Sequence, residues 1–330
     1  MDLGHYRYLS EEQLRKQYRD PCFAVKIKDY AFEGHTALET IELPNEIAEI
    51  GRNAFEHCTS LNRIEIPHSV SVIEKETFMD CTSLTEVVLN NVVEIRDDAF
   101  KGCTSLKSVT ANLDSYCLPE TLEMIGEGAF SGCTSLESIN LGFVKSIGSE
   151  AFQGCTSLRE VGLPQSGSIG PDAFLNCHSL RTVVIPHGIK EIGDSAFYGC
   201  DWLEYVEIPD SVEKIGFGAF SKCPSLKEFR GSYKGIDAAG SILVNNSVLI
   251  SYASGSGVNP IISGSITAIG DCAFQESKLS GSIRIPSTVK IIGADAFDGC
   301  AGLEEAVIGE STEIDPSSSF PDYVKVIRKK

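Results

Sequence analysis

An isoleucine followed five residues later by a phenylalanine recurs along almost the whole chain. Most successive copies are 22 or 23 residues apart. Self-similarity at this period is typical of a solenoid, in which each repeat buries its apolar side against its neighbours. The eleven copies are Ile27/Phe32, Ile50/Phe55, Ile73/Phe78, Ile95/Phe100, Ile125/Phe130, Ile147/Phe152, Ile169/Phe174, Ile192/Phe197, Ile215/Phe220, Ile269/Phe274 and Ile292/Phe297.

Each repeat divides into a strand half and a turning half. In the copy that begins at Ile192, the apolar residues Leu203, Val206 and Ile208 alternate with polar ones, which predicts a short strand. Glycine follows the isoleucine in eight of the eleven copies, which favours a tight bend or a close approach between backbones. The phenylalanine never varies, so we expect one phenylalanine per repeat to stack in the core.

The repeated pattern Ala-Phe-x-Gly-Cys-Thr-Ser-Leu-x-x-Val-x-Ile-Pro-x-Ser-Val resembles the BspA-type leucine-rich-repeat family, from about residue 27 to 310. The resemblance implies a leucine-rich-repeat solenoid with a parallel strand ladder on a concave face and a mostly irregular convex side. It also implies a bacterial protein, often secreted or at the cell surface, that binds host or matrix partners. No catalytic residue comes with the resemblance.

The repeats set the expected domain organisation. We expect one structural domain with an N-terminal cap over 1–26, eleven repeats over 27–310 and a C-terminal cap over 311–330. The sequence Ser10-Glu-Glu-Gln13 resembles a capping box that opens a short helix to about Arg19. A degenerate twelfth copy surrounds Phe320, and Tyr323-Val-Lys-Val-Ile327 predicts a closing strand.

Two insertions interrupt the period. Between Phe220 and Phe274, residues 241–250 predict a β-hairpin that leaves the solenoid within an insertion near 231–260, followed by a flexible tip at 254–257. This hairpin could bind a partner strand, dimerise or cover a weak point in the stack. Eight residues are added between Phe100 and Phe130, around Cys117, and this loop is either a contact site or a tolerated insertion.

The charge balance excludes two classes of partner. Lys and Arg number 28 and Asp and Glu number 46, giving a net charge of −18. Binding to nucleic acid or to an anionic membrane surface needs an excess of basic residues, so neither is expected. Membrane insertion is not expected either, because no apolar run approaches the ~20 residues of a membrane span. The first residues lack the apolar core of a signal peptide, so we expect a cytosolic protein or one whose targeting segment has been removed.

The cysteines follow the repeat. Equivalent positions in stacked strands lie about 4.8 Å apart, but parallel side chains disfavour the disulfide dihedral, so buried, reduced thiols are predicted. Cys22, Cys117 and Cys272 fall outside the pattern and are the better candidates for a disulfide or a reactive thiol. The nine cysteines at the repeat position are Cys58, Cys81, Cys103, Cys133, Cys155, Cys177, Cys200, Cys223 and Cys300.

Motifs for catalysis, cofactors and metals are missing. The sequence has no nucleophile elbow, P-loop or dinucleotide fingerprint, so neither an enzyme nor a cofactor is expected. A cluster of His35, His57, Cys58 and Cys81 is conceivable in the first repeats, but metal-ligand spacing is lacking and no metal is expected.

A protein-binding surface is therefore expected on the strand face. The outward position between the valine and isoleucine of each strand is small and neutral in the middle of the array and acidic near its N-terminal end. Trp202 and Tyr205 are typical interface anchors, although they could equally pack on a neighbouring loop. The candidate partner-binding residues are Glu65, Val88, Thr110, Asn140, Val184, Trp202, Tyr205 and Glu207.

Two other functions stay open. An adhesin-like or structural surface protein would use the same scaffold to bind host or matrix components. Carbohydrate binding would call for a row of exposed aromatic side chains, and the outward positions offer only Tyr205, so a protein partner is favoured.

Overall fold

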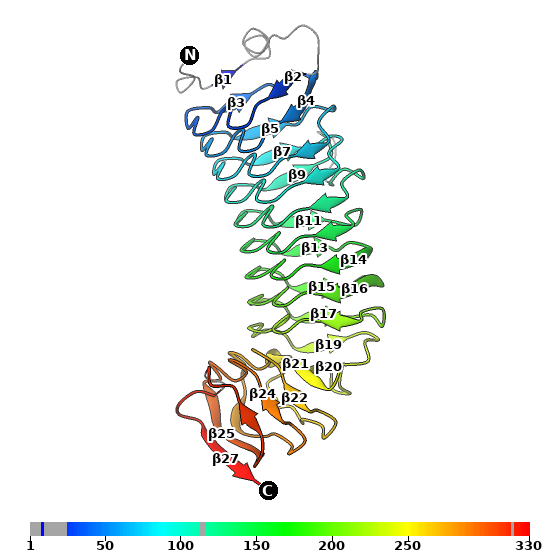
Figure 1. Cartoon of the computed structure of the whole chain (residues 1–330), viewed down its shortest axis with the longest axis vertical. Coiled ribbons are helices and arrows are strands. Elements are labelled where there is room, and N and C mark those ends of the chain that lie inside the picture. Colours follow the sequence, from blue (N-terminus) through cyan, green and yellow to red (C-terminus); the bar gives the residue numbers. More distant parts are fainter. Residues whose placement is uncertain (1–7, 10–24, 113–116, 318–319) are drawn as a thin grey trace. The chain divides into compact units, whose positions relative to one another are not determined.

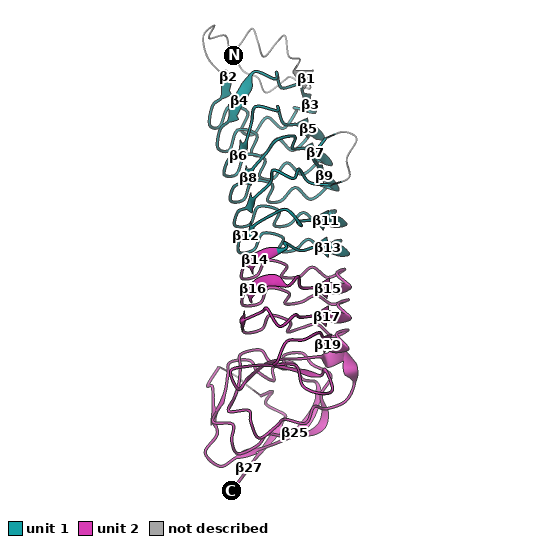
Figure 2. Ribbon diagram, turned by 90° about the vertical axis from the view of Figure 1, so that its right-hand side faces the viewer, with its two compact units in different colours: residues 1–165 teal, residues 166–330 magenta. Residues whose placement is uncertain are grey.

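The computed structural model describes residues 8–9, 25–112, 117–317 and 320–330. The chain divides into two compact units, residues 1–165 and residues 166–330, which are coloured separately in Figure 2. The predicted cap helix from Ser10 to Arg19, and Cys22 beside it, lie outside the described residues.

The first unit consists of short parallel strands in two ladders (Figure 1). The Val ladder holds β1 (Tyr8–Leu9) and the strands at the repeat position that is valine in the consensus pattern and valine or isoleucine in these copies. These strands are β3 (Thr40–Ile41), β5 (Arg63–Glu65), β7 (Glu86–Val88) and β9 (Ser108–Thr110), and then β11 (Ser138–Asn140) and β13 (Glu160–Gly162). The Ile ladder holds the strands that end at the isoleucine of each Ile/Phe pair: β2 (Val25–Ile27), β4 (Ile47–Ile50), β6 (Val72–Ile73), β8 (Glu94–Ile95), β10 (Met124–Ile125) and β12 (Ser146–Ile147).

The second unit continues both kinds of strand. Its Val ladder has two parts, β15 (Thr182–Val184), β17 (Tyr205–Glu207) and β19 (Glu228–Arg230), and then β23 (Ser280–Arg284), β25 (Gly302–Gly309) and β27 (Lys325–Lys329). Its Ile ladder begins with β14 (Ser166–Ile169), β16 (Gly188–Ile192) and β18 (Lys214–Ile215). A further sheet holds β20 (Ile242–Asn245), β21 (Val248–Tyr252), β22 (Ala268–Ile269), β24 (Ile291–Ile292) and β26 (Glu313–Ile314), and the helical turn η1 covers Ser254–Ser256.

The fold is the predicted parallel-strand β-solenoid, with almost no helix. Equivalent residues pair in register from one repeat to the next, as where Ile64 of β5 lies beside Val87 of β7. A strand is present near the predicted closing segment, because β27 pairs in parallel with β25.

The phenylalanines form the predicted core. All eleven are at most 1% exposed. In the first unit the ring of Phe32 stacks on that of Phe55 with centroids 5.0 Å apart, and Phe130 stacks on Phe152 at 5.3 Å, with ring planes within 6° of parallel. In the second unit Phe320 stacks on Phe297 at 4.5 Å, so the degenerate twelfth copy also supplies a core ring.

The glycine after the isoleucine allows neighbouring backbones to approach closely, as predicted. A Cβ atom on Gly126 would lie 2.7 Å from the main-chain nitrogen of Asp97 in the preceding repeat. The Asp97 carboxylate uses this space to accept a hydrogen bond from the main-chain N–H of Glu127 at 3.0 Å. The same arrangement recurs at three other pairs of repeats, where Asp29 bonds Arg52, Asp194 bonds Phe217 and Asp271 bonds Ala294.

The repeat-position cysteines are buried, and each thiol for which a bond is described donates to the main-chain carbonyl of a phenylalanine in the preceding repeat. Cys81 Sγ lies 3.1 Å from Phe55 O, and Cys103 Sγ lies 3.1 Å from Phe78 O. The Phe55 carbonyl also accepts the main-chain N–H of Cys58 in its own repeat. The remaining thiol–carbonyl pairs are Cys58–Phe32, Cys133–Phe100, Cys155–Phe130, Cys200–Phe174, Cys223–Phe197 and Cys300–Phe274.

The insertion between Phe220 and Phe274 contains the predicted hairpin, but the hairpin does not leave the solenoid. Strands β20 and β21 pair in antiparallel fashion, and β21 then pairs in parallel with β22 of the next repeat. Leu243 and Leu249 are fully buried, and the ring of Tyr252 packs on Phe274 with centroids 5.4 Å apart. The hairpin is a layer of the core, because its strands are apolar on both faces.

The predicted flexible tip is also part of the stack. Ser254 is 4% exposed, and its hydroxyl accepts the main-chain N–H of Lys278 at 3.0 Å. The N–H of Gly255 donates to the carbonyl of Leu226 at 2.6 Å. These bonds join η1 to the repeats on both sides of the insertion.

Candidate functional site

The strand face of the first unit differs from the prediction at its centre. Glu65 is exposed, but Val88 is 1% and Thr110 is 5% exposed, so neither side chain is available to a partner. The chain folds back after β9, where the N–H of Ala111 donates to the carbonyl of Cys117 at 2.7 Å, and Leu118 is buried. Cys117 and Leu118 lie beside Val109 and Asn140 at the border of one pocket.

Asn140 borders a small pocket of about 330 Å³ on the same unit. Its side-chain oxygen accepts the N–H of Gly142 at 3.1 Å. A Cβ atom on Gly162 would lie 2.5 Å from that oxygen, so a larger residue on the neighbouring strand would displace the Asn140 side chain. Cys117, Leu118 and Glu160 also border this pocket.

The acidic end of the same face forms a second pocket, of about 530 Å³, in which Glu42 and Glu65 lie with Arg63. The guanidinium of Arg63 is paired with Glu86 on the next strand, Nε to Oε2 at 3.1 Å. The carboxylates of Glu42 and Glu65 also line this pocket, in agreement with the acidic character expected from the sequence.

On the second unit the predicted residues lie together. Val184 of β15 pairs in register with Glu207 of β17, which pairs with Arg230 of β19. Val184 is 60% exposed. Tyr205 precedes Val206 on β17, and its ring lies under two cations, with Arg230 at 3.8 Å and Lys227 at 5.4 Å from the ring centroid.

Trp202 lies in the turn that leads into β17 and is 56% exposed. The guanidinium of Arg181, from the preceding repeat, lies 5.7 Å from its ring centroid. The main-chain N–H of Trp202 donates to the carbonyl of His178 at 3.1 Å, which fixes the turn. An aromatic side chain that stays exposed while its backbone is fixed is available as an interface anchor.

We call this group the β17 cluster, and its members are Arg181, Val184, Trp202, Tyr205, Glu207, Lys227 and Arg230. Two of its cations are paired, Lys227 with Glu204 and Arg230 with Glu228. The Lys227 ammonium lowers the pKa of the Glu204 carboxyl, chiefly through their hydrogen bond. Sequence reasoning did not select Arg181 and Lys227, although both follow the leucine of a repeat and so occupy the same position beside the strand.

The structure thus divides the eight predicted residues between the two units. Val184, Trp202, Tyr205 and Glu207 are grouped on the second. On the first, Glu65, Val88 and Thr110 lie on consecutive strands, with Asn140 on β11.

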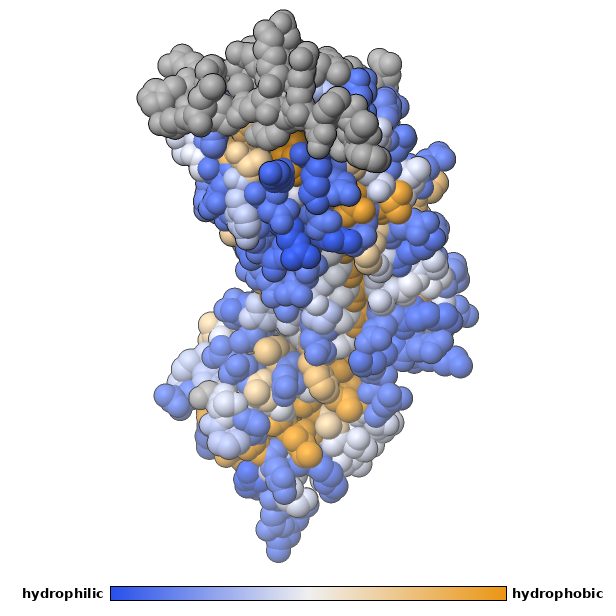
Figure 3. All heavy atoms as spheres, turned by 45° about the horizontal axis from the view of Figure 1, so that its top comes forward, coloured by the Kyte–Doolittle hydropathy of each residue, from blue (hydrophilic) through white to orange (hydrophobic). Residues whose placement is uncertain are grey.

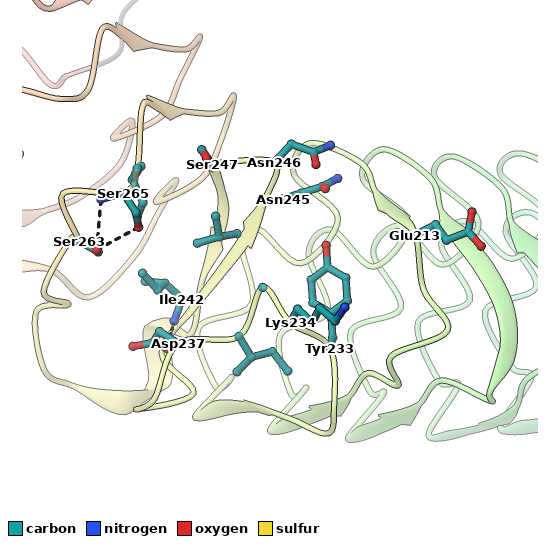
Figure 4. A pocket seen from close by; sticks show the side chains of 14 residues that line it. Glu213, Tyr233, Lys234, Asp237, Ile242, Asn245, Asn246, Ser247, Ser263 and Ser265 are labelled. Atoms are coloured by element: carbon teal, nitrogen blue, oxygen red, sulfur yellow. Dashed lines mark hydrogen bonds between the residues drawn. The ribbon is translucent and has the colours of Figure 1, made fainter.

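A further pocket, of about 480 Å³, lies beside the insertion of the second unit (Figure 4). Glu213 contributes from the position just before β18, Tyr233 and Lys234 from the segment after β19, and Asn245 and Asn246 from the hairpin turn. Ser263 and Ser265 close the opposite side and are hydrogen-bonded to each other at 3.0 Å. The carboxylate of Asp237 accepts the N–H groups of Ser241 and Ile242, so it is already hydrogen-bonded within the insertion.

No group of histidine, cysteine and carboxylate side chains that could hold a metal ion occurs among the described residues. Cys58 and Cys81 instead donate to main-chain carbonyls in the core. Burial raises the pKa of the Cys58, Cys155 and Cys223 thiols to about 12, so these groups are protonated at neutral pH and are poor nucleophiles and metal ligands.

The repeat pattern matches a known family model. The model of the BspA type leucine rich repeat region, in six copies, matches residues 21–114, 110–227 and 251–327. The chain belongs to the BspA-type leucine-rich-repeat family. Family membership indicates a protein-interaction or surface repeat scaffold, and such scaffolds are generally not enzymes. No curated protein sequence matches this BspA-type chain.

Solved structures of bacterial leucine-rich-repeat proteins share the fold. A leucine-rich-repeat protein from Bacteroides ovatus is 27% identical with a TM-score of 0.60, covering 93% of this chain and 88% of its own. A leucine rich cell surface protein from Faecalibacterium prausnitzii is 24% identical with a TM-score of 0.53, covering 92% and 83%. The pneumococcal vaccine antigen PcpA is 20% identical with a TM-score of 0.55, covering 81% and 68%.

The described part of this BspA-type chain contains no helix with the length and apolar character of a membrane span. On the face drawn in Figure 3, hydrophobic residues are most extensive over the C-terminal repeats. Exposed apolar side chains of the second unit include Val184, Trp202, Phe217, Val258, Ile261 and Ile291.

Proposed function

We propose that the chain is a non-enzymatic scaffold that binds another protein through the strand face of its second unit, at the β17 cluster. The observation that carries the proposal is the exposure of Val184 and Trp202, at 60% and 56%, on strands and turns fixed by the parallel ladder. Exposed aromatic and apolar residues on a rigid support lose little conformational entropy on binding, which favours their use as anchors.

The charges around these anchors fit a protein partner better than a nucleic acid. Arg181, Lys227 and Arg230 are matched in number by Glu204, Glu207 and Glu228 on the same repeats. A surface of mixed charge around apolar anchors has the composition of a polar interface rim. It lacks the basic excess that phosphate groups need.

Site-specific photo-crosslinking in cells that produce the protein tests this proposal. A photoreactive residue at position 184 is expected to capture a discrete protein, and Trp202→Ala or Val184→Glu is expected to weaken binding of that protein by at least about tenfold, because charge buried at an interface core is costly. The same residue placed at Phe143, which is 53% exposed on the first unit, is the matched control.

Capture at position 143 but not at 184, or binding that is unchanged by both substitutions, would assign the interface to another surface. Melting temperatures of the variants are expected to match that of the unmodified chain, because both side chains are already exposed.

A further inference from the structure

The pocket of about 480 Å³ in the second unit lies between the segment after β19, the hairpin β20–β21 and the loop before β22 (Figure 4). Its volume falls within the range of small-molecule pockets, about 300–1,000 Å³. The floor is apolar, because Ile242 and Ile266 line the pocket and are 2% and 1% exposed. The rim is polar and includes Tyr233, Asn246 and Ser263, one from each of the three segments.

The ring of Tyr233 is held at the border of this pocket by its backbone and by Gly235. The N–H of Tyr233 donates to the carbonyl of Ile208 at 3.0 Å, and the carbonyl of Tyr233 accepts the N–H of Ile236 at 3.2 Å. A Cβ atom on Gly235 would lie 1.8 Å from the carbonyl oxygen of Val244 and 2.5 Å from Cε1 of the Tyr233 ring. Glycine at this position therefore lets the ring and strand β20 come together, so the aromatic wall of the pocket is fixed by the fold.

Several polar groups of the rim are free to bind a ligand. Among the residues that the structure describes, none is hydrogen-bonded to the hydroxyl of Tyr233, the side-chain amide of Asn246 or the hydroxyl of Ser247. In Figure 4 the hydroxyl of Tyr233 points toward the hairpin turn that carries the other two groups. Burial raises the pKa of the Tyr233 phenol, so this group is a protonated donor at neutral pH.

The carboxylates of the pocket are already engaged and disfavour an anionic ligand. Glu213 Oε1 lies 3.0 Å from the ammonium of Lys190, and the Asp237 carboxylate accepts two main-chain N–H groups of the insertion. One basic residue, Lys234, also lines the pocket and is outnumbered by these two carboxylates. A ligand carboxylate or phosphate would lie beside them on a chain with a net charge of −18, so an uncharged ligand is favoured.

We propose that this pocket binds an uncharged saccharide. A sugar ring has C–H groups on its faces and hydroxyl groups around its edge, so it is matched by an aromatic wall with amide and hydroxyl partners beside it. Tyr233 supplies the aromatic wall, and Asn246 and Ser247 supply donors and acceptors. Asn245 lines the pocket with them, and its amide nitrogen already donates to the Ile215 carbonyl, which leaves its side-chain oxygen as a further acceptor.

The pocket is separate from the strand face, where carbohydrate binding is disfavoured because Tyr205 is the only aromatic residue at the outward positions. It shares no residue with the β17 cluster and does not depend on the proposed function. A protein partner would need exposed apolar anchors, whereas the apolar floor of this pocket is buried beneath a polar rim.

An array of defined glycans, probed with the labelled full chain, tests the proposal. The chain is expected to bind uncharged glycans and to leave glycans with sialic or uronic acids unbound. Calorimetric titration with a selected glycan should show that Tyr233→Ala weakens binding by at least about tenfold, because the stacking wall is lost. Asn246→Gly should weaken binding by at least about threefold through loss of the amide, and glycine adopts the φ of 49° at this position without strain.

Tyr233→Phe keeps the ring and removes the hydroxyl, so its affinity should lie between those of Tyr233→Ala and the unmodified chain, and it replaces Tyr233→Ala if the alanine variant does not fold. Trp202→Ala and Phe143→Ser serve as controls that leave glycan binding unchanged, so failure of this proposal is distinguishable from failure of the proposed function. The proposal is overturned if no glycan is bound, if only acidic glycans are bound, or if Tyr233→Phe and Asn246→Gly bind the selected glycan as tightly as the unmodified chain.

Discussion

The side-chain amide of Asn245 donates a hydrogen bond to the main-chain carbonyl of Ile215 at 3.3 Å. In the regular repeats the carbonyl of the paired isoleucine accepts a main-chain N–H of the next repeat, as when Gly216 donates to Ile192 at 2.8 Å. Asn245 therefore supplies from a side chain the donor that the insertion removes from the Ile ladder. Asn259 does the same for β23 of the Val ladder.

Replacement of Asn245 by leucine is expected to destabilise the second unit by about 1–2 kcal/mol, because the Ile215 carbonyl loses its donor. Hydrogen exchange at the amides of Val244 and Leu249 should become faster. The neighbouring Asn246→Gly is the matched control, since Asn246 has φ of 49°, which glycine adopts without strain. Equal unfolding free energies for Asn245→Leu and the unmodified chain would show that the bond contributes nothing.

Replacement of Phe152 by alanine should cost about 3–5 kcal/mol and should also loosen the neighbouring repeats, because each repeat is supported by the next. Phe152 is fully buried and stacks on Phe130. Phe143→Ala, at a position 53% exposed on the same unit, is the control and should have little effect. An unchanged melting temperature and unchanged exchange protection for Phe152→Ala would contradict the core role of the phenylalanines.

Replacement of Gly126 by alanine is expected to destabilise the first unit by about 1–3 kcal/mol through overpacking. Its Cβ atom would lie 2.6 Å from the Asp97 carboxylate and 2.7 Å from the Asp97 main-chain nitrogen, and the backbone cannot move aside as a side chain does. Gly264→Ala is the matched control, because no atom lies within 4 Å of the equivalent Cβ position. Urea unfolding of both variants measures the difference, and similar midpoints would refute the close approach.

Replacement of Cys103 by alanine is expected to cost about 1–2 kcal/mol, since it removes the bond to Phe78 and leaves a small void. Cys103→Ser, which keeps a donor, should fall between alanine and the unmodified chain. The chain itself contains this substitution in the Phe274 repeat, where Ser277 occupies the cysteine position with its hydroxyl 3.3 Å from Cys300 Sγ. A serine variant less stable than the alanine variant would argue against a structural thiol donor.

The buried thiols also predict a pH dependence. Burial raises the pKa of Cys58, Cys155 and Cys223 from 9.0 to about 12 in the folded chain. Between these values the unfolded chain loses thiol protons that the folded chain retains, so stability falls as pH rises above 9, by up to about 1.4 kcal/mol per pH unit for each such thiol. Denaturant unfolding from pH 8 to 10.5 measures the slope, and replacement of one of these cysteines by alanine should reduce it.

A thiol reagent gives an independent check. Native protein should react slowly at the repeat-position cysteines, and unfolded protein should react at all of them. Linked pairs among Cys58, Cys81, Cys103 and Cys133 in mass spectra would contradict reduced thiols and would indicate an oxidising compartment.

The repeat made the core predictable from sequence. Phe152 and its equivalents recur at one position, and a position that recurs in every repeat reports packing against identical neighbours. The close backbone approach at the glycine after the isoleucine was predictable for the same reason, although the residue that it approaches was not. The pairing of Gly126 with Asp97 becomes visible only when adjacent repeats are compared.

The candidate site was less predictable, because it depends on departures from the repeat. Val88 and Thr110 occupy outward positions by pattern, but both are buried in the structure. The hairpin has the sequence of two apolar strands, but only the pairing of Leu249 with Ile269 shows that it is a core layer. The roles of Asn245 and Asn259 could not be predicted, since a side chain that replaces a main-chain donor leaves no periodic signal.

The thiol-to-carbonyl bonds have a consequence for how such an array changes in evolution. The thiol of a cysteine in one repeat donates its hydrogen bond to a carbonyl of the repeat before it. The cysteine therefore contributes this stabilisation only where that acceptor is in place. The copy of Ile27 and Phe32 carries His35 instead of cysteine, and the copy after the insertion carries Ser277. Duplication or deletion inside the regular run preserves every donor and acceptor. An insertion placed before a repeat relieves selection for the cysteine of that repeat, which accounts for Ser277 after the insertion between Phe220 and Phe274.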